Sequence, residues 1–150
     1  MTPSLLTIAN VLSEVESSHN PKALRFEPGI FQRIPEHSII DKIAVIHHCN
    51  SATARIIYCM SYGYYQIMGF NLFGDVINYD KTIFDFCTDS GLQQLYLSRF
   101  LSFIGYPDGP DFDNPSDLLE FSTRYNGPEN PESYKNALLI AYNRKGTENG

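Results

Sequence analysis

The fold of this chain is constrained most by apolar residues that recur at helical spacing between residues that cap or end helices. The first such stripe is formed by Leu5, Ile8, Leu12 and Val15. The polar run of residues 17–21 follows and should end that helix. The sequence therefore begins with an amphipathic helix.

The C-terminal half shows the same pattern more clearly. Asp80 and Ser90 can cap two helices, and each of the pairs Asn114-Pro115 and Asn130-Pro131 places a good N-cap residue before a proline tolerated in the first turn. The last helix should pack on the core through a stripe formed by Tyr134, Ala137, Leu138, Ala141 and Tyr142. We expect residues from about 145 to 150 to be a frayed tail.

The first half is less regular. Residues 23–27 fit a short extended piece, Pro28 suits the start of a short helix over PGIFQR, and Ser51 can cap a helix over ATARIIYCM. Residues 35–50 fit either a strand rich in β-branched residues or a buried helix, and we favour the helix. The chain is therefore expected to be one domain, residues 1–150, mostly α, with about six to eight short helices and at most a small β element in the first half.

Composition limits the classes of partner. The chain has 150 residues, of which 43% are apolar and 19% charged, enough for one compact core. Its 17 carboxylates exceed its 11 Lys and Arg residues, so we expect no nucleic-acid partner. No segment is long and apolar enough to insert into a membrane. Nor is there a basic stretch before the first helix like that of a signal peptide, so we expect synthesis in a cytoplasm.

Metal and cofactor sites have little support. Cys49, Cys59 and Cys87 are an odd set without C-x-x-C spacing, as expected of reduced thiols. The side chains of the consecutive residues His47, His48 and Cys49 diverge, so they cannot form a tight zinc site. The sequence also contains no phosphate-binding glycine loop. We expect neither a metal nor a cofactor.

Glu16 is the first candidate for chemistry. At 100° per residue the apolar stripe of the first helix spans about 60° to 140°, and Glu16 falls at about 160°, at the edge of that face. The helix C-terminus and partial burial both disfavour its ionised form and should raise its pKa. A general acid for glycosidic cleavage needs this property, although many helices end in a solvated Glu.

Four stretches carry a resemblance to a known family: VESS at 15–18, LRFEPGIF at 24–31, YGYYQIMGFN at 62–71 and RYNGP at 124–128. Together they resemble the N-acetylmuramidase domain of bacteriophage endolysins and, more distantly, lytic transglycosylases and goose-type lysozymes. Those enzymes share a Glu-Ser at a helix end, a Gly-x-x-Gln-Ile segment and a Tyr-Asn-Gly segment, in that order. The resemblance covers nearly the whole chain and implies a lysozyme-like fold with Glu16 as the acid.

The resemblance also implies a peptidoglycan cleft. The stretch SYGYYQIMGF places aromatic rings beside an amide, which suits a sugar, although a buried turn is the alternative. By resemblance, Gly63 lets the backbone approach the glycan, Gln66 bonds near the catalytic carboxyl or the sugar, and Tyr64 or Tyr65 offers a ring face.

Two further segments are placed by the same resemblance. Tyr125 and Asn126, in a loop before the last helix, should orient Glu16 and hold a sugar group, whereas Ser17 more plausibly supports the helix end. Relatives often have Trp or Arg where Tyr64 and Tyr65 stand, which leaves the stacking at the subsites open. They also often carry a wall-binding module, for which this chain has no length.

The mechanism depends on a second carboxylate. Glu27 in LRFEP is the best candidate for the base or nucleophile of a hydrolase, and its alternatives are capping the short helix or pairing with Arg25 or Arg33. If Glu27 points away, Glu16 could act alone as acid and base and give the 1,6-anhydromuramic product of a lytic transglycosylase. We favour hydrolysis because QIMGFN resembles the muramidases more closely.

Other functions stay open at this point. The chain could be a non-catalytic glycan-binding or structural part of a phage tail or secretion machine, or a chitinase. We expect it to reach peptidoglycan glycan strands in the wall or periplasm, either after release from the cytoplasm or as part of a virion or other delivery assembly.

Overall fold

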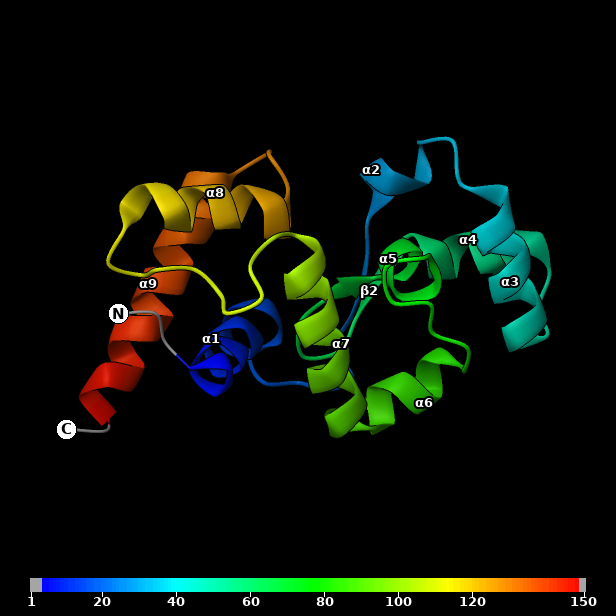
Figure 1. The fold of residues 1–150 in the computed structure, drawn as a ribbon. Coiled ribbons are helices and arrows are strands. Elements are labelled where there is room, and N and C mark those ends of the chain that lie inside the picture. The colour runs from blue at the N-terminus through cyan, green and yellow to red at the C-terminus, as the bar shows by residue number, and fades with distance from the viewer. Residues whose placement is uncertain (1–3, 149–150) are drawn as a thin grey trace.

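The computed structural model describes residues 4–148, with side chains described through residue 145, and is mostly helical (Figure 1). Its elements are α1 (Leu5–Ser17), β1 (Leu24–Phe26), α2 (Pro28–Phe31), α3 (His37–His47), α4 (Ser51–Tyr58), β2 (Met60–Tyr62), β3 (Ile67–Met68), α5 (Gly69–Phe73), α6 (Ile83–Thr88), α7 (Ser90–Phe103), α8 (Pro115–Asn126) and α9 (Pro131–Glu148).

The mostly helical prediction is confirmed, with a small three-stranded sheet in the first half. The described residues contain nine helices rather than six to eight, because α2 and α5 are single turns of four and five residues. The favoured helix over residues 35–50 is present as α3, and the extended piece is present as β1. No helix in the described part of the chain is long and apolar enough to cross a bilayer.

Helix starts follow the predicted capping chemistry, with small shifts. Asn114 caps α8 as expected, accepting from the backbone N–H groups of Ser116 and Asp117. Three predicted caps were wrong: α4 is capped by Asn50, α6 by Thr82 and α7 by Asp89. The cap lies one residue before the predicted position in α4 and α7 and two residues after it in α6, and in each case its side-chain oxygen accepts from a free backbone N–H group of the first turn, which is what selects a cap.

The helices form two groups with α7 between them (Figure 1). On one side α9 packs against α1 and α8, and on the other α3, α4 and α5 pack together beside the sheet. The sheet is antiparallel in the order β1-β2-β3, with Leu24 opposite Tyr62 and Phe26 opposite Met60. One buried apolar cluster runs through both groups, and its largest fully buried side chains include Tyr62, Phe73, Tyr79 and Phe121.

The first helix, α1, packs against the last helix, α9. The expected stripe on α9 buries Tyr134, Leu138 and Ala141, while Tyr142 stacks on Phe112 with ring centroids 4.2 Å apart. α9 continues to Glu148, so the tail expected to fray from about residue 145 begins inside the helix, and residues 149–150 lie outside the described part. Packing of α1 on α9 therefore brings residues from the two ends of the sequence together.

Candidate active site

Glu16 lies in the last full turn of α1, which ends at Ser17 because Ser18 adopts a left-handed conformation. Its carboxylate accepts a hydrogen bond from the Tyr134 hydroxyl of α9. Burial raises the pKa of Glu16 to about 7, although the bond from Tyr134 and the positive charge of Arg25 act in the opposite direction. The negative charge of Glu27 adds to the rise. Glu16 therefore keeps its proton to near neutral pH, as the wheel argument predicted.

Two tyrosines surround this carboxyl. The rings of Tyr125 and Tyr134 are stacked, with centroids 6.1 Å apart and planes 14° apart. Burial, and then the charge of Glu16, raises the pKa of both hydroxyls well above the usual value, so both remain hydrogen-bond donors. Tyr134 donates to Glu16, while Tyr125 donates over 2.9 Å to the backbone carbonyl of Tyr65.

The position of Tyr125 and Asn126 corrects a prediction. They lie in the last turn of α8 and not in a loop, because the helix begun at Pro115 continues to Asn126 and stops only at Gly127, where φ is 91°. Asn126 is exposed there. The hydroxyl that bonds Glu16 belongs to Tyr134, which the sequence presents only as one member of an apolar stripe.

β1 and the residue that follows it supply the other charged groups near Glu16. Arg25 Nε lies 2.6 Å from Glu27 Oε1, with the two side chains 57% and 31% exposed. Glu27 stands at the N-cap position of α2, but its side chain makes no capping bond. Of the alternatives considered for Glu27, the structure therefore shows pairing with Arg25, in a position from which its charge acts on Glu16.

Ser17 connects α1 to the turn between β2 and β3. Its hydroxyl lies 2.9 Å from the carbonyl oxygen of Tyr64 and 3.0 Å from that of Ser13, and donates to them. This agrees with the expectation that Ser17 supports the helix end. Tyr65 is 4% exposed and Tyr64 is half-buried, so of the two rings only that of Tyr64 has a substantial free surface.

Gly63 is packed inside the protein. We had expected its backbone to be open to the glycan. It is buried with φ of 77°, and a Cβ there would lie 2.3 Å from Gln93 Oε1. Gln93 is fully buried, and its amide accepts from Tyr64 N at 2.7 Å and donates to the carbonyls of Pro21 and Phe86. Only glycine therefore fits between the turn and this amide.

Gln66 likewise acts within the protein. Its φ is 48°, which turns the side chain back over its own hairpin. The amide donates to the carbonyls of Gly63 and Ala23 and accepts from the Ser61 hydroxyl at 2.8 Å. The expectation that Gln66 bonds near the catalytic carboxyl is corrected: its hydrogen-bonding groups hold the turn to the segment before β1.

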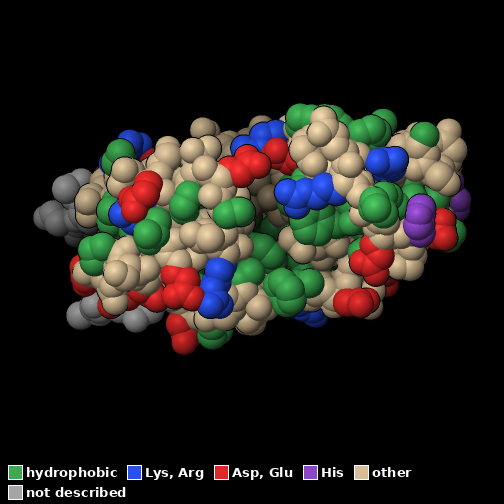
Figure 2. Space-filling model, turned by 90° about the horizontal axis from the view of Figure 1, so that it is seen from above, with side chains coloured by type: hydrophobic (Ala, Val, Ile, Leu, Met, Phe, Trp, Pro, Cys, Tyr) green, Lys and Arg blue, Asp and Glu red, His purple; other side chains and the backbone are tan. Residues whose placement is uncertain are grey.

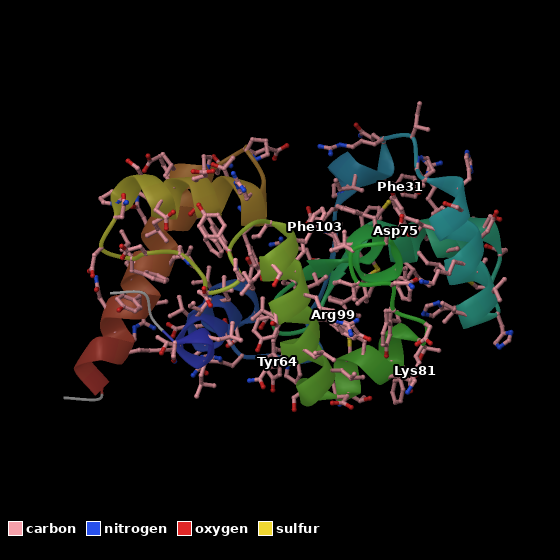
Figure 3. All side chains as sticks on the ribbon, viewed as in Figure 1. Phe31, Tyr64, Asp75, Lys81, Arg99 and Phe103 are labelled. Carbon is pink, nitrogen blue, oxygen red and sulfur yellow. The ribbon has the colours of Figure 1, made fainter. Side chains whose placement is uncertain are left out.

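One face of the molecule is hollowed. Seen from above, the molecule has a recess near its middle, between the side formed by α8 and α9 and the side formed by α2 and α3, with hydrophobic side chains on its floor (Figure 2). Phe103 at the end of α7 and Phe31 at the end of α2 lie on either side of this opening (Figure 3). β1, which carries Arg25, leads through Glu27 into α2 at the same opening.

Sequence reasoning missed three residues of this region. Gln93 looks like any polar helix residue, and Arg25 drew notice only as a partner for Glu27. Tyr134 has the right spacing for a core residue, and nothing local distinguishes its hydroxyl from that of any other tyrosine. Only the packing of α1 on α9 shows that the Tyr134 hydroxyl is the hydrogen-bond donor to the Glu16 carboxyl.

A model of the N-acetylmuramidase family matches residues 46–145, which include the β2–β3 turn, Tyr125 and Tyr134. The chain belongs to the N-acetylmuramidase family. It is also 37% identical over 143 residues to the endolysin of Enterobacteria phage PRD1, covering 90% of this chain and 93% of that relative. No solved structure matches.

The chain is therefore an enzyme that acts on peptidoglycan as a glycoside hydrolase, so the non-catalytic alternative is not supported. The family match begins at residue 46, beyond Glu16 and Glu27. The roles of those two carboxyls consequently depend on the geometry described above.

Proposed function

We propose that this muramidase hydrolyses the β-1,4 bond between N-acetylmuramic acid and N-acetylglucosamine, with Glu16 as general acid. The observation that carries this proposal is the burial of the Glu16 carboxyl at the end of α1, which raises its pKa to about 7. An acid with this pKa is protonated under mildly acidic to neutral conditions and can give its proton to the leaving glycosidic oxygen.

Tyr134 positions this acid. A hydroxyl that donates to one carboxylate oxygen fixes the plane of the carboxyl and leaves the other oxygen to carry the proton. The same bond stabilises the carboxylate that forms once the proton has left. Burial and the Tyr134 bond therefore act at different stages, before and after proton transfer.

Glu27 is the proposed second carboxylate. Its charge reaches Glu16, and it stands between β1 and α2, where the chain leads to the opening of the recess. As a base it would take a proton from water, which then attacks the anomeric carbon on the face opposite the leaving group. That inverting geometry needs carboxyls about 6.5–9.5 Å apart, whereas direct attack by Glu27 needs about 5–5.5 Å.

The Arg25–Glu27 ion pair favours a second candidate, a lytic transglycosylase. A carboxylate held 2.6 Å from a guanidinium nitrogen is less free to hold a water molecule. Glu16 would then protonate the leaving oxygen, and as a carboxylate take the proton of the muramic acid 6-hydroxyl, whose oxygen closes on the anomeric carbon. The product is a 1,6-anhydro end, one water lighter than the hydrolysis product.

Replacement of Glu16 tests the assignment. Glu16→Gln should lower the rate of peptidoglycan cleavage about 10²–10⁴-fold, measured as loss of turbidity of permeabilised cells. Glu14→Gln is the matched control, because Glu14 lies on the same helix but pairs with Arg144 at 2.6 Å and should leave the rate nearly unchanged. A Glu16→Gln protein that keeps the parental rate contradicts the proposal. Product masses from the parent separate hydrolysis from transglycosylation.

The route to the substrate is proposed by analogy with the relative named an endolysin. We propose that this chain is made in the host cytoplasm and cleaves the wall after release. Delivery on a phage tail is the alternative. Fractionation of infected cells before and after lysis, compared with purified virions, distinguishes the two, because only a virion-associated protein copurifies with the particles.

A further inference from the structure

A second hollow, separate from the recess of Figure 2, lies between α1, the β2–β3 turn and the first turn of α7. It has a volume of about 360 Å³. The residues that form most of its wall are Asn10, Ser13, His19, Tyr64, Tyr65 and Gln94. Tyr64 lies between α1 and α7 at the lower edge of Figure 3, far from the opening that Phe31 and Phe103 flank at the top.

The backbone of Tyr64 and Tyr65 separates this hollow from the candidate active site. The carbonyl oxygens of the two residues accept bonds from Ser17 and Tyr125, next to Glu16 and Tyr134. Both residues also line the hollow, and of the two only Tyr64 has a substantial exposed surface. The turn that was expected to stack sugars beside the catalytic carboxyl thus also forms part of the wall of the second hollow.

The wall of the hollow is polar but carries no carboxylate, lysine or arginine among the described residues that line it. This is notable in a chain with 17 acidic and 11 basic residues. The Asn10 amide can donate and accept, the exposed Gln94 amide hydrogen-bonds the Tyr65 hydroxyl and has further donor and acceptor capacity, and the half-buried Tyr64 offers an apolar face. Such a wall suits a neutral ligand with hydroxyl and amide groups, and it offers no cation to an anionic one.

The wall is also held in place before any ligand arrives. Gln93 accepts from the Tyr64 backbone N–H group, and Ser18 and His19 both have positive φ, which returns the His19 ring to α1. There His19 Nδ1 lies 2.7 Å from the hydroxyl of Ser13, itself 5% exposed. A preorganised wall loses little conformational entropy when it binds.

We propose that this hollow is an accessory binding site for an N-acetylhexosamine unit of a glycan strand, distinct from the unit that is cleaved. It would hold the enzyme on the wall between cleavage events, and this role rests on the proposed peptidoglycan substrate. The acetamido group and ring hydroxyls meet the Asn10 and Gln94 amides, while a sugar face packs on Tyr64.

The test uses full-length protein carrying Glu16→Gln, so that no substrate is consumed, and the β-1,4-linked dimer of N-acetylglucosamine as the probe. Nuclear magnetic resonance titration should shift the side-chain amide signals of Asn10 and Gln94. Adding Asn10→Ala and Gln94→Ala should weaken binding at this site about tenfold, because two hydrogen bonds are lost. Both side chains are exposed, but Gln94 also hydrogen-bonds the buried Tyr65, so circular dichroism of the double variant is compared with that of the parent to check the fold.

Activity provides the second readout. In the parental background, the Asn10→Ala/Gln94→Ala variant should cleave short soluble oligomers at the parental rate but degrade intact sacculi several-fold more slowly. Shifts confined to residues around Glu16, or equal affinity of the double variant, overturn the accessory site. Because binding is measured without turnover, a failure of the catalytic assignment at Glu16 would appear separately, in the turbidity assay.

Discussion

Glu16 and Glu27 are the same residue type in two opposite settings. Glu16 lies near the end of a long helix, half-buried against α9, and burial raises its pKa to about 7 although it accepts a bond from a tyrosine hydroxyl. Glu27 stands just after the edge strand β1, partly exposed, with an arginine as its partner. Burial makes Glu16 a proton donor near neutral pH, whereas Glu27 is a partly exposed carboxyl that pairs with a cation. The comparison shows that the surroundings of a carboxyl decide which step it can perform.

The largest effect that would sharpen this comparison is expected from Glu27→Gln. If Glu27 serves as base or nucleophile, the rate of peptidoglycan cleavage should fall at least about 10²-fold, because an amide can neither accept a proton nor attack. The control is Glu120→Gln, which alters another exposed Glu–Arg pair, formed with Arg124 within α8. A Glu27→Gln protein that keeps its rate and forms anhydro ends would instead assign both steps to Glu16.

A smaller effect is expected from Tyr134→Phe. The hydroxyl lowers the pKa of Glu16 by donating to its ionised form, so removing it should raise that pKa further. The alkaline limb of the plot of kcat/KM against pH should therefore move to higher pH, because Glu16 stays protonated over a wider range of pH. Tyr125→Phe is the control, because its hydroxyl donates to the Tyr65 carbonyl and the limb should stay in place. A limb that moves to lower pH contradicts the positioning role.

The smallest effect concerns folding stability. Because the pKa of Glu16 is raised from 4.5 to about 7, the folded protein binds more protons than the unfolded chain between those values. Its contribution is fully present below about 4.5 and is lost as pH rises through about 7. The melting temperature of Glu16→Gln, relative to that of the parent at the same pH, should therefore rise by a few °C as the pH is raised from 4 to 8. For a chain of this size a change of about 1 kcal/mol in the free energy of unfolding shifts the melting temperature by roughly 2–4 °C.

Thermal denaturation followed by circular dichroism measures this difference. Glu27→Gln, which alters a partly exposed pair, is the control and should show no comparable gain above pH 7. A Glu16→Gln advantage that does not grow with pH would mean that Glu16 is solvated, which would remove the contrast between the two carboxyls.

The sequence predicted well those features that depend on local interactions. Cap residues and apolar spacing act over three or four residues, so α1, α8 and α9 could be placed from the chain alone. The same local geometry placed Glu16 at the edge of the apolar face. Shifts of one or two residues at the caps of α4, α6 and α7 arose because several polar residues stood near each start.

The tertiary structure decided which groups meet. Tyr134 bonds Glu16 from 118 positions away, and only the packing of α1 on α9 brings the two together. The expected sugar-binding turn, in which Gly63 and Gln66 have positive φ, is bonded to Gln93 and Ala23, and its two tyrosines lie in the wall of another hollow. Short-range forces thus set the helices and one candidate acid, but partners, burial and the face that each ring presents arise from contacts between distant segments.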